Sequence, residues 1–338
     1  MKNTLILIII FILLGGGTYW LIQKNKESGQ SSVLPMERDF AIKNIEDIGK
    51  IFLVDRDGHR TLLERIGNSD EWRYNKKYKA RANAMENLLR AVKEIEMRYQ
   101  PAEAAKKNIM NSIATKGIKV EIYDKKGEKM KTYYIGGAPN DELGTYAIID
   151  GAEQPMVIHI PTFSGNVRFR YNLNGDDWRD RHIFDAPLEK IEEVSVEYPS
   201  QKDKSFRIIK RADGYDVSPY YDIAPKYTGE PNQKIIETYL LTLPEKQIMG
   251  FENEYTQKET AKKGAPFCTI TLKTSDGKEQ SLSVWPQWGA PVVNADAEQT
   301  NAKPNVTRYF GEMNGKDFVS LSYNTIRPYF AEYDSFFK

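Results

Sequence analysis

The stretch Ile48–Arg65, IGKIFLVDRDGHRTLLER, decides the fold of this chain. Apolar positions alternate on both sides of Asp57-Gly58, a dipeptide that suits the positive φ angles of a tight turn. The stretch is therefore predicted to form a β-hairpin. A short strand follows at Trp72 and Tyr74, and an amphipathic helix is predicted after it, because five apolar residues recur at helical spacing: Met85, Leu88, Leu89, Val92 and Ile95.

The order of elements in this first half recurs about 150 residues later. In the first half, two hairpins follow the helix, and the first of them opens with the strand Ile118–Ile122. In the second half, the opening strands are predicted at Ile191–Tyr198 and Ser205–Arg211, and a helix at Ile236–Leu243. Alternation then resumes at Cys268–Leu272 and continues into further hairpins. We interpret the body as one structural plan repeated in tandem.

Each repeat is predicted to be an α+β unit, a mostly antiparallel sheet with one amphipathic helix on one face. The units are placed at residues 38–162 and 188–338. The segment 163–187 joins them. It and the C-terminal stretch Tyr323–Phe337 are rich in aromatic residues and arginine, so both are expected to pack near the contact between the units.

The N-terminal residues 1–24 are predicted to be a transmembrane anchor. Thr4–Ile22 contains no charged residue, and nineteen residues in a helix span about 30 Å, the thickness of a bilayer's hydrocarbon core. A cleaved signal peptide is the alternative, with Gly15–Gly17 as the cleavage region. The polar stretch 25–37 is interpreted as a tether. We expect residues 4–22 to contact lipid in a single pass through the inner (cytoplasmic) membrane, with the body in the periplasm.

Composition excludes several classes of function. Lys plus Arg is 48 and Asp plus Glu is 47, so the chain lacks the positive charge of a general nucleic-acid binder. No phosphate-binding loop, dinucleotide fingerprint, nucleophile elbow or zinc-protease motif occurs, so no cofactor is predicted. The three histidines lack metal-ligand spacing. Cys268, the only cysteine, lies in an alternating strand pattern and is interpreted as a small buried apolar residue.

The densest charged cluster lies in the joining segment and reads DDWRDRH. A structural role is favoured, with the arginines bridging aspartates or strand-end carbonyl groups, because a guanidinium bonds a carboxylate through two parallel hydrogen bonds. Partner binding is the second interpretation, and hydrolysis through Asp176, Asp177 or Asp180 is the third. The residues that carry these interpretations are Asp177, Trp178, Arg179, Asp180 and Arg181.

Two tryptophans, Trp285 and Trp288, precede a long polar stretch, Asn294–Asn305. Aromatic rings beside a long loop suit stacking on a sugar ring or gripping a peptide. They also suit a small satellite core beneath the loop, which is the favoured interpretation. Trp285 and Trp288 are therefore the residues expected to carry any glycan or envelope-fragment binding.

Five short motifs stand out: Glu71–Tyr74, Tyr78–Ala82, Lys116–Val120, Ile135–Tyr146 and Trp178–Arg181. Together they resemble the bacterial envelope family known as domain of unknown function 4340, and the match is clearest over residues 38–200. The resemblance implies an envelope protein with an N-terminal membrane segment, and some relatives are thought to accompany ABC-type export or gliding machinery. It implies no catalytic residues.

Anchor, tether and a β-rich body without a catalytic motif together favour a non-enzymatic protein-binding or scaffolding module. We expect its partner to be an envelope protein, with a transporter complex as one possibility. Glycan binding and hydrolysis stay open as alternatives.

Overall fold

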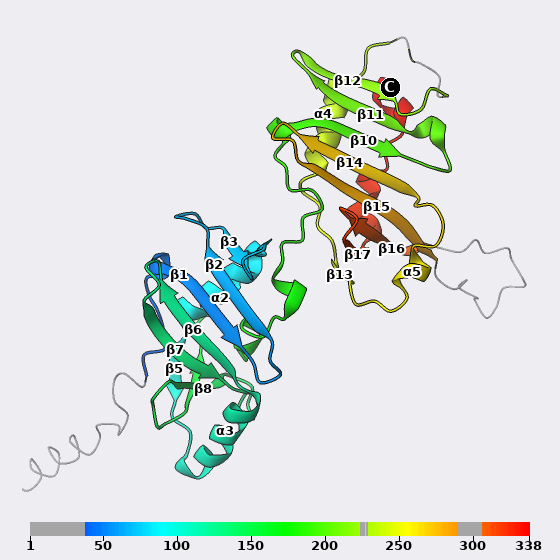
Figure 1. Cartoon of the computed structure of the whole chain (residues 1–338). Coiled ribbons are helices and arrows are strands. Elements are labelled where there is room, and N and C mark those ends of the chain that lie inside the picture. Colours follow the sequence, from blue (N-terminus) through cyan, green and yellow to red (C-terminus); the bar gives the residue numbers. More distant parts are fainter. Residues whose placement is uncertain (1–37, 224–226, 228, 289–305) are drawn as a thin grey trace, which may run out of the picture. The chain divides into compact units, whose positions relative to one another are not determined.

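The computed structural model describes residues 38–223, 227, 229–288 and 306–338. The chain divides into two compact units, the first ending at Trp178 and the second beginning at Arg179 (Figure 1). Each unit has its own antiparallel sheet and few helices, so the prediction of two α+β units is confirmed. The expected anchor, Thr4–Ile22, lies outside the described residues, and no described helix has the length and apolar character to cross a membrane.

In the described part of the first unit, nine strands form one sheet in the order β4-β3-β2-β1-β6-β7-β8-β9-β5. The opening stretch forms the predicted hairpin, in which Ile51 of β1 lies opposite Leu63 of β2. The strands are β1 (Ile48–Val54), β2 (Arg60–Arg65), β3 (Trp72–Tyr74), β4 (Tyr78–Lys79), β5 (Glu96–Tyr99), β6 (Ile118–Asp124), β7 (Lys129–Ile135), β8 (Thr145–Ile149) and β9 (Met156–His159).

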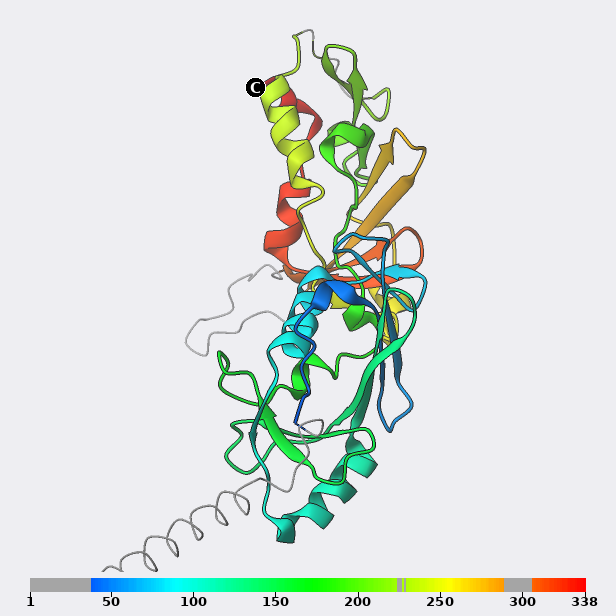
Figure 2. The same ribbon diagram turned by 90° about the vertical axis from the view of Figure 1, so that its left-hand side faces the viewer.

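Helix α2 (Ala82–Glu94) covers one side of this sheet, as Figure 2 shows. Its Leu88 and Val92 are fully buried and share a core with Ile51 of β1. A second helix, α3 (Glu103–Lys116), packs through Ile109 and Ile113 on Ile148 of β8. The prediction of one helix per unit is therefore wrong for the first unit. The helix was missed because its apolar face is weak, with only those two isoleucines buried.

The second unit repeats this plan with the order β12-β11-β10-β14-β15-β16-β17-β13 in its described part. Helix α4 (Gln233–Thr242) packs on the core face, and two four-residue helices follow it, α5 (Lys258–Ala261) and α6 (Tyr323–Ile326). The strands are β10 (Ile191–Glu197), β11 (Phe206–Arg211), β12 (Gly214–Pro219), β13 (Gly250–Phe251), β14 (Cys268–Thr274), β15 (Glu279–Trp288), β16 (Val306–Met313) and β17 (Asp317–Leu321).

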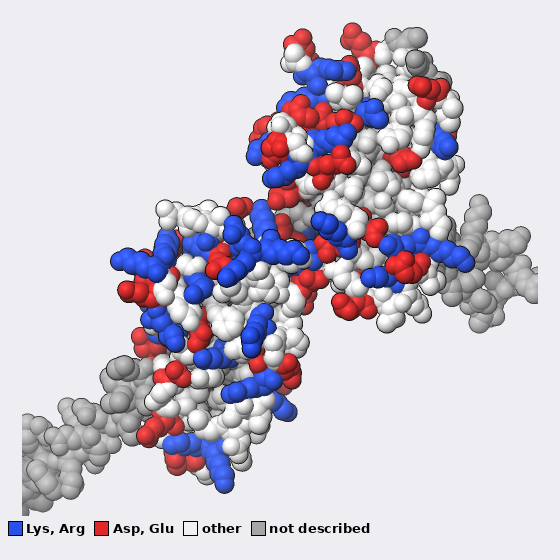
Figure 3. All heavy atoms as spheres, viewed as in Figure 1, with Lys and Arg blue, Asp and Glu red and all other residues white. Residues whose placement is uncertain are grey.

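The other face of the second sheet is charged. Glu193 of β10 pairs with Arg207 of β11 at 3.2 Å and with Lys273 of β14 at 3.6 Å. Figure 3 shows basic and acidic side chains interspersed over this face. Cross-strand pairs of opposite charge suit a sheet face that meets water.

The two units share local irregularities as well as strand order. In each, the first strand shifts register against its neighbour near its start, at Ile48/Lys50 in β1 and at Ile191/Glu193 in β10. In each unit, a backbone N–H in the turn that follows the paired strand (β6 or β14) donates to the carbonyl group just before the first strand (β1 or β10). The bonds are Lys125 N–H to Asp47 O (3.0 Å) and Ser275 N–H to Lys190 O (2.8 Å). Register shifts recur among related structures, so these matches support duplication of one unit.

The aromatic segments expected near the contact between the units pack into the cores: 163–187 contributes to both cores, and Tyr323–Phe337 to the second. Trp178 is buried in the first core, and its carbonyl accepts the Arg81 N–H at the start of α2 (2.8 Å). Phe336 is buried in the second core, and its carbonyl accepts the Asn232 N–H at the start of α4 (2.7 Å). An equivalent backbone hydrogen bond therefore ties the end of each unit to the start of its helix. The boundary after Trp178 divides the predicted joining segment 163–187.

Candidate functional site

The charged cluster of the joining segment is divided between the two units. Asp176, Asp177 and Trp178 lie in the 3-10 helix η4 (Gly175–Trp178) and belong to the first unit. Asp180 belongs to the second. The three carboxylates considered for hydrolysis are thus not brought together within one unit.

Arg179 makes a buried ion pair. Its Nη1 and Nη2 donate to the two carboxylate oxygens of Asp317, at 2.9 and 2.7 Å, and its guanidinium lies 3.9 Å from the ring centre of Phe251. Asn253 donates to the same carboxylate at 3.2 Å. The two-bond geometry is strong and directional, so Arg179 ties the start of the second unit to β17. Sequence reasoning did not find Asp317, which lies 138 residues away and in no motif.

Asp180 and Arg181 bind neighbouring groups of the second unit. Asp180 Oδ1 accepts the Arg181 N–H at 2.8 Å and contacts His182 Nδ1 at 2.7 Å. With Nδ1 donating to Asp180, His182 Nε2 accepts from Gln247 Nε2 at 3.1 Å. Arg181 Nη1 donates to the Met249 carbonyl at 2.9 Å. These bonds orient the imidazole and engage one of the two carboxylate oxygens of Asp180.

Cys268 lies in the core of the second unit with no exposed surface, and burial raises the pKa of its thiol. Because only the thiolate is a good nucleophile, we expect no reaction with a thiol reagent at pH 8 in the folded chain. Full reaction is expected once the chain is unfolded in denaturant. A colorimetric thiol titration measures both, and fast labelling of the folded chain would contradict this placement.

Trp285 borders a hollow of about 460 Å³ in the second unit. The residue is only 8% exposed, and its Nε1 donates to the Gly264 carbonyl at 3.3 Å. The Trp288 side chain lies outside the described part of the structure. The lining residues are Tyr255, Gln257, Thr260, Ala261, Lys263, Ala265, Trp285, Pro286 and Gln287.

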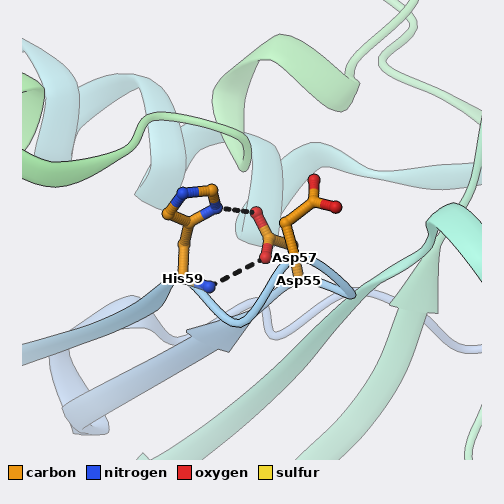
Figure 4. Close-up of side chains that lie close together, drawn as sticks. All are labelled: Asp55, Asp57 and His59. Carbon is orange, nitrogen blue, oxygen red and sulfur yellow. Dashed lines mark hydrogen bonds and ion pairs between the residues drawn. The ribbon is translucent and has the colours of Figure 1, made fainter.

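Asp55, Asp57 and His59 gather at the turn between β1 and β2 (Figure 4), with ligand atoms within 4.8 Å of one another. Both carboxylate oxygens of Asp55 are engaged by His59, Oδ1 by the backbone N–H at 2.9 Å and Oδ2 by Nδ1 at 2.8 Å. A cation would have to displace these hydrogen bonds, so the geometry fits a turn stabilised by side-chain hydrogen bonds better than it fits a metal centre.

Burial alone raises the pKa of Asp55, but the hydrogen bonds from His59 outweigh it and lower the pKa overall. A lowered carboxyl pKa stabilises the fold above the unfolded-state pKa, and this stabilisation is lost as pH falls through the folded-state pKa. We therefore expect Asp55→Ala to cost at most about 1 kcal/mol at neutral pH. Denaturation of both proteins across pH tests this, since the difference should vanish at low pH.

An open groove lies in the first unit between α2, β3 and the 3-10 helix η2 (Ile45–Asp47), with a volume of about 480 Å³. We call it the α2 groove. Five of its residues are apolar, and charged residues complete its lining. The lining residues are Ile45, Asp70, Trp72, Ala82, Met85, Glu86, Leu89, Arg90, Lys93 and Glu94.

Trp72 carries an unused polar group in this groove. The residue is 2% exposed, Arg65 lies over its ring at 4.8 Å, and its indole N–H has no hydrogen-bond partner among the described residues. A buried donor without an acceptor costs roughly 1–3 kcal/mol. A lining residue of the α2 groove therefore has unsatisfied hydrogen-bonding capacity.

The second unit fills the equivalent position with one of its own side chains. Asn232 occupies the place of Arg81 at the helix start, so Gln233 is the counterpart of Ala82. Gln233 accepts the Tyr215 N–H at 2.8 Å and donates to the Tyr215 carbonyl at 3.0 Å, and Tyr215 of β12 is the counterpart of Trp72. Alanine at position 82 cannot make such a bridge, which leaves the first unit's groove open.

Comparison with known proteins gives a family and no characterised relative. No curated protein and no solved structure matches this chain. The model of the family described as "Domain of unknown function (DUF4340)" matches residues 72–266. This range includes β3 and α2, which line the α2 groove, and it covers more than half of the 338 residues. The chain therefore belongs to the DUF4340 family, as the motifs of its first half predicted.

Proposed function

We propose that this chain is a membrane-tethered, non-enzymatic module that binds a protein partner through the α2 groove. The observation that carries the proposal is the groove itself. Apolar residues together with charged ones are typical of the lining of a protein-binding surface, and the second unit fills the same position with its own Gln233.

The tethering part of the proposal rests on the sequence of residues 1–37. An uncharged stretch of nineteen residues followed by a polar linker suits a single membrane pass. A large body after one N-terminal anchor suits placement in the periplasm, on the outer side of the cytoplasmic membrane. There the module would serve as an accessory of an envelope complex, such as a transporter.

Two substitutions test the groove. Ala82→Gln imports the side chain by which the second unit fills this position, and Leu89→Glu places a charge on the half-buried edge of the groove. Both are expected to abolish co-purification of the partner from gently solubilised membranes. Ala82→Gln should cost little thermal stability because Ala82 is exposed, whereas Leu89→Glu should cost some because Leu89 packs partly on the first core. Leu241→Glu is the matched control, because Leu241 is 49% exposed on α4 and corresponds to position 90. Equal recovery with all three variants would contradict the proposal.

A second candidate function, binding of a glycan or envelope fragment, is favoured only by the hollow beside Trp285. Gln257, Thr260 and Gln287 offer polar groups around it. Sugar stacking needs an open ring face, and the 8% exposure of Trp285 offers little. If this function holds, a peptidoglycan fragment should change the tryptophan fluorescence of the chain. That change should be lost in Trp285→Phe and retained in Ala82→Gln.

A further inference from the structure

The exposed ridge of α2 along the groove has opposite charges on either side of one leucine. At helical spacing, Ala82, Glu86, Leu89 and Lys93 lie on one face. Glu86 precedes Leu89 by three residues and Lys93 follows it by four. Two such helices packed antiparallel, with Leu89 against Leu89, therefore bring each glutamate close to a lysine of the other helix.

We propose that the α2 groove receives helix α2 of a second copy of this chain, in a two-fold symmetric pair with Leu89 at the axis. This proposal rests on the proposed function and names the partner of the same groove. In a two-fold interface every contact occurs twice, so one complementary pair of residues supplies two ion pairs.

The charges of this ridge are available for such a pair. Neither Glu86 nor Lys93 has an ion-pair partner among the described residues, and both are exposed. Arg90 differs, since it donates to Glu94 at 3.2 Å and to Thr162 at 2.9 Å within its own unit. Glu86 and Lys93 are therefore the pair that a second copy would satisfy.

The shape of the groove suits a helix ridge. Ala82 has a small side chain, which lets a second backbone come close, and half-buried Leu89 supplies an apolar knob. On the other side, Ile45 and Trp72 provide apolar walls.

The second unit provides an internal comparison. By the correspondence of Arg81 with Asn232, the counterparts of Glu86, Leu89 and Lys93 are Glu237, Leu240 and Pro244. Leu240 is fully buried, and Pro244 carries no positive charge that could pair with Glu237 of a second helix. The self-complementary ridge is thus a property of α2 and is not shared by α4.

Charge reversal in the full chain, purified in detergent, tests the pairing. Glu86→Lys alone and Lys93→Glu alone each place like charges together twice and are expected to weaken self-association roughly tenfold or more. Two combinations restore opposite charges: the double variant with itself, and an equimolar mixture of the two single variants. Both are expected to recover most of the wild-type association in sedimentation velocity.

A disulfide tests the geometry independently of the N-terminal segment. Leu89→Cys places the new thiol at the symmetry axis, and mild oxidation is expected to link two copies. Cys268 does not interfere because it is buried. Leu241→Cys, exposed on α4, is the control and is expected to stay unlinked.

The outcomes separate this inference from the proposed function. A chain that stays monomeric and does not cross-link at position 89, or a mixture that associates no better than either single variant, overturns the second copy as partner. If Ala82→Gln and Leu89→Glu still remove a different protein from the purified complex, the proposed function stands without it. If the groove variants change neither self-association nor co-purification, both proposals fall.

Discussion

Replacing Trp178 by alanine is expected to destabilise the first unit by about 3–5 kcal/mol. The indole is fully buried in the first core, and its Nε1 donates to the Leu173 carbonyl at 2.7 Å. Alanine leaves a cavity and an unpaired carbonyl, and it loosens the segment whose backbone accepts the Arg81 N–H. Because whole domains are stable by only about 5–15 kcal/mol, a large share of the first unit's stability depends on this ring.

Hydrogen exchange measured by mass spectrometry locates the effect of Trp178→Ala. Peptides covering the start of α2 and the end of the first unit should exchange faster than in the wild type. Trp178→Phe is the control, since it fills most of the volume and loses only the indole hydrogen bond, and it should cost about 1–2 kcal/mol. Similar losses for alanine and phenylalanine would mean that the hydrogen bond, rather than packing, governs this position.

Replacing Arg179 by alanine is expected to destabilise the second unit by about 3 kcal/mol, the low end for breaking a buried ion pair. The low end applies because the Asp317 side chain is 25% exposed while that of Arg179 is 8% exposed. Removal of the guanidinium takes two hydrogen bonds from the Asp317 carboxylate, which keeps the Asn253 amide as a donor, and it uncovers the ring of Phe251. Adjacent residues in the sequence thus stabilise different units.

Exchange in β13 and β17 should report Arg179→Ala, since Phe251 and Asp317 lie in those strands. The double variant Arg179→Met with Asp317→Leu is the informative companion. It removes both charges at similar volume and is expected to recover much of the lost stability. If the double variant is no more stable than Arg179→Ala, the ion pair does not account for the effect, and the contact with Phe251 becomes the leading cause.

Most of the fold could be predicted because its signals are local. The alternation around Asp57-Gly58 predicted the first hairpin, and the spacing of Leu88 and Val92 predicted α2. Helix α3 escaped because it buries few apolar residues on a small satellite cluster, which leaves little periodicity to detect. The tandem repeat could also be predicted from local patterns, because strands, turns and helix follow in the same order in both halves of the sequence.

The candidate sites were less predictable. Arg179 was expected to bond a carboxylate or carbonyl group at the junction between the units. The sequence could not name Asp317, because only the chain path brings β17 to Arg179. The α2 groove has no sequence motif, since η2, β3 and α2 supply its lining from separate segments. Its openness depends on alanine at position 82, and that became apparent only beside Gln233 in the second unit.

By itself, the sequence determined the class of fold, its duplication and the DUF4340 family, because periodicity and short motifs depend on residues that are neighbours along the chain. The tertiary structure alone decided where one unit ends, which carboxylate Arg179 binds and which apolar surface stays uncovered. Those properties depend on residues far apart in sequence that meet when the sheets form. Whether a groove is filled or open depends on what the folded chain places across it.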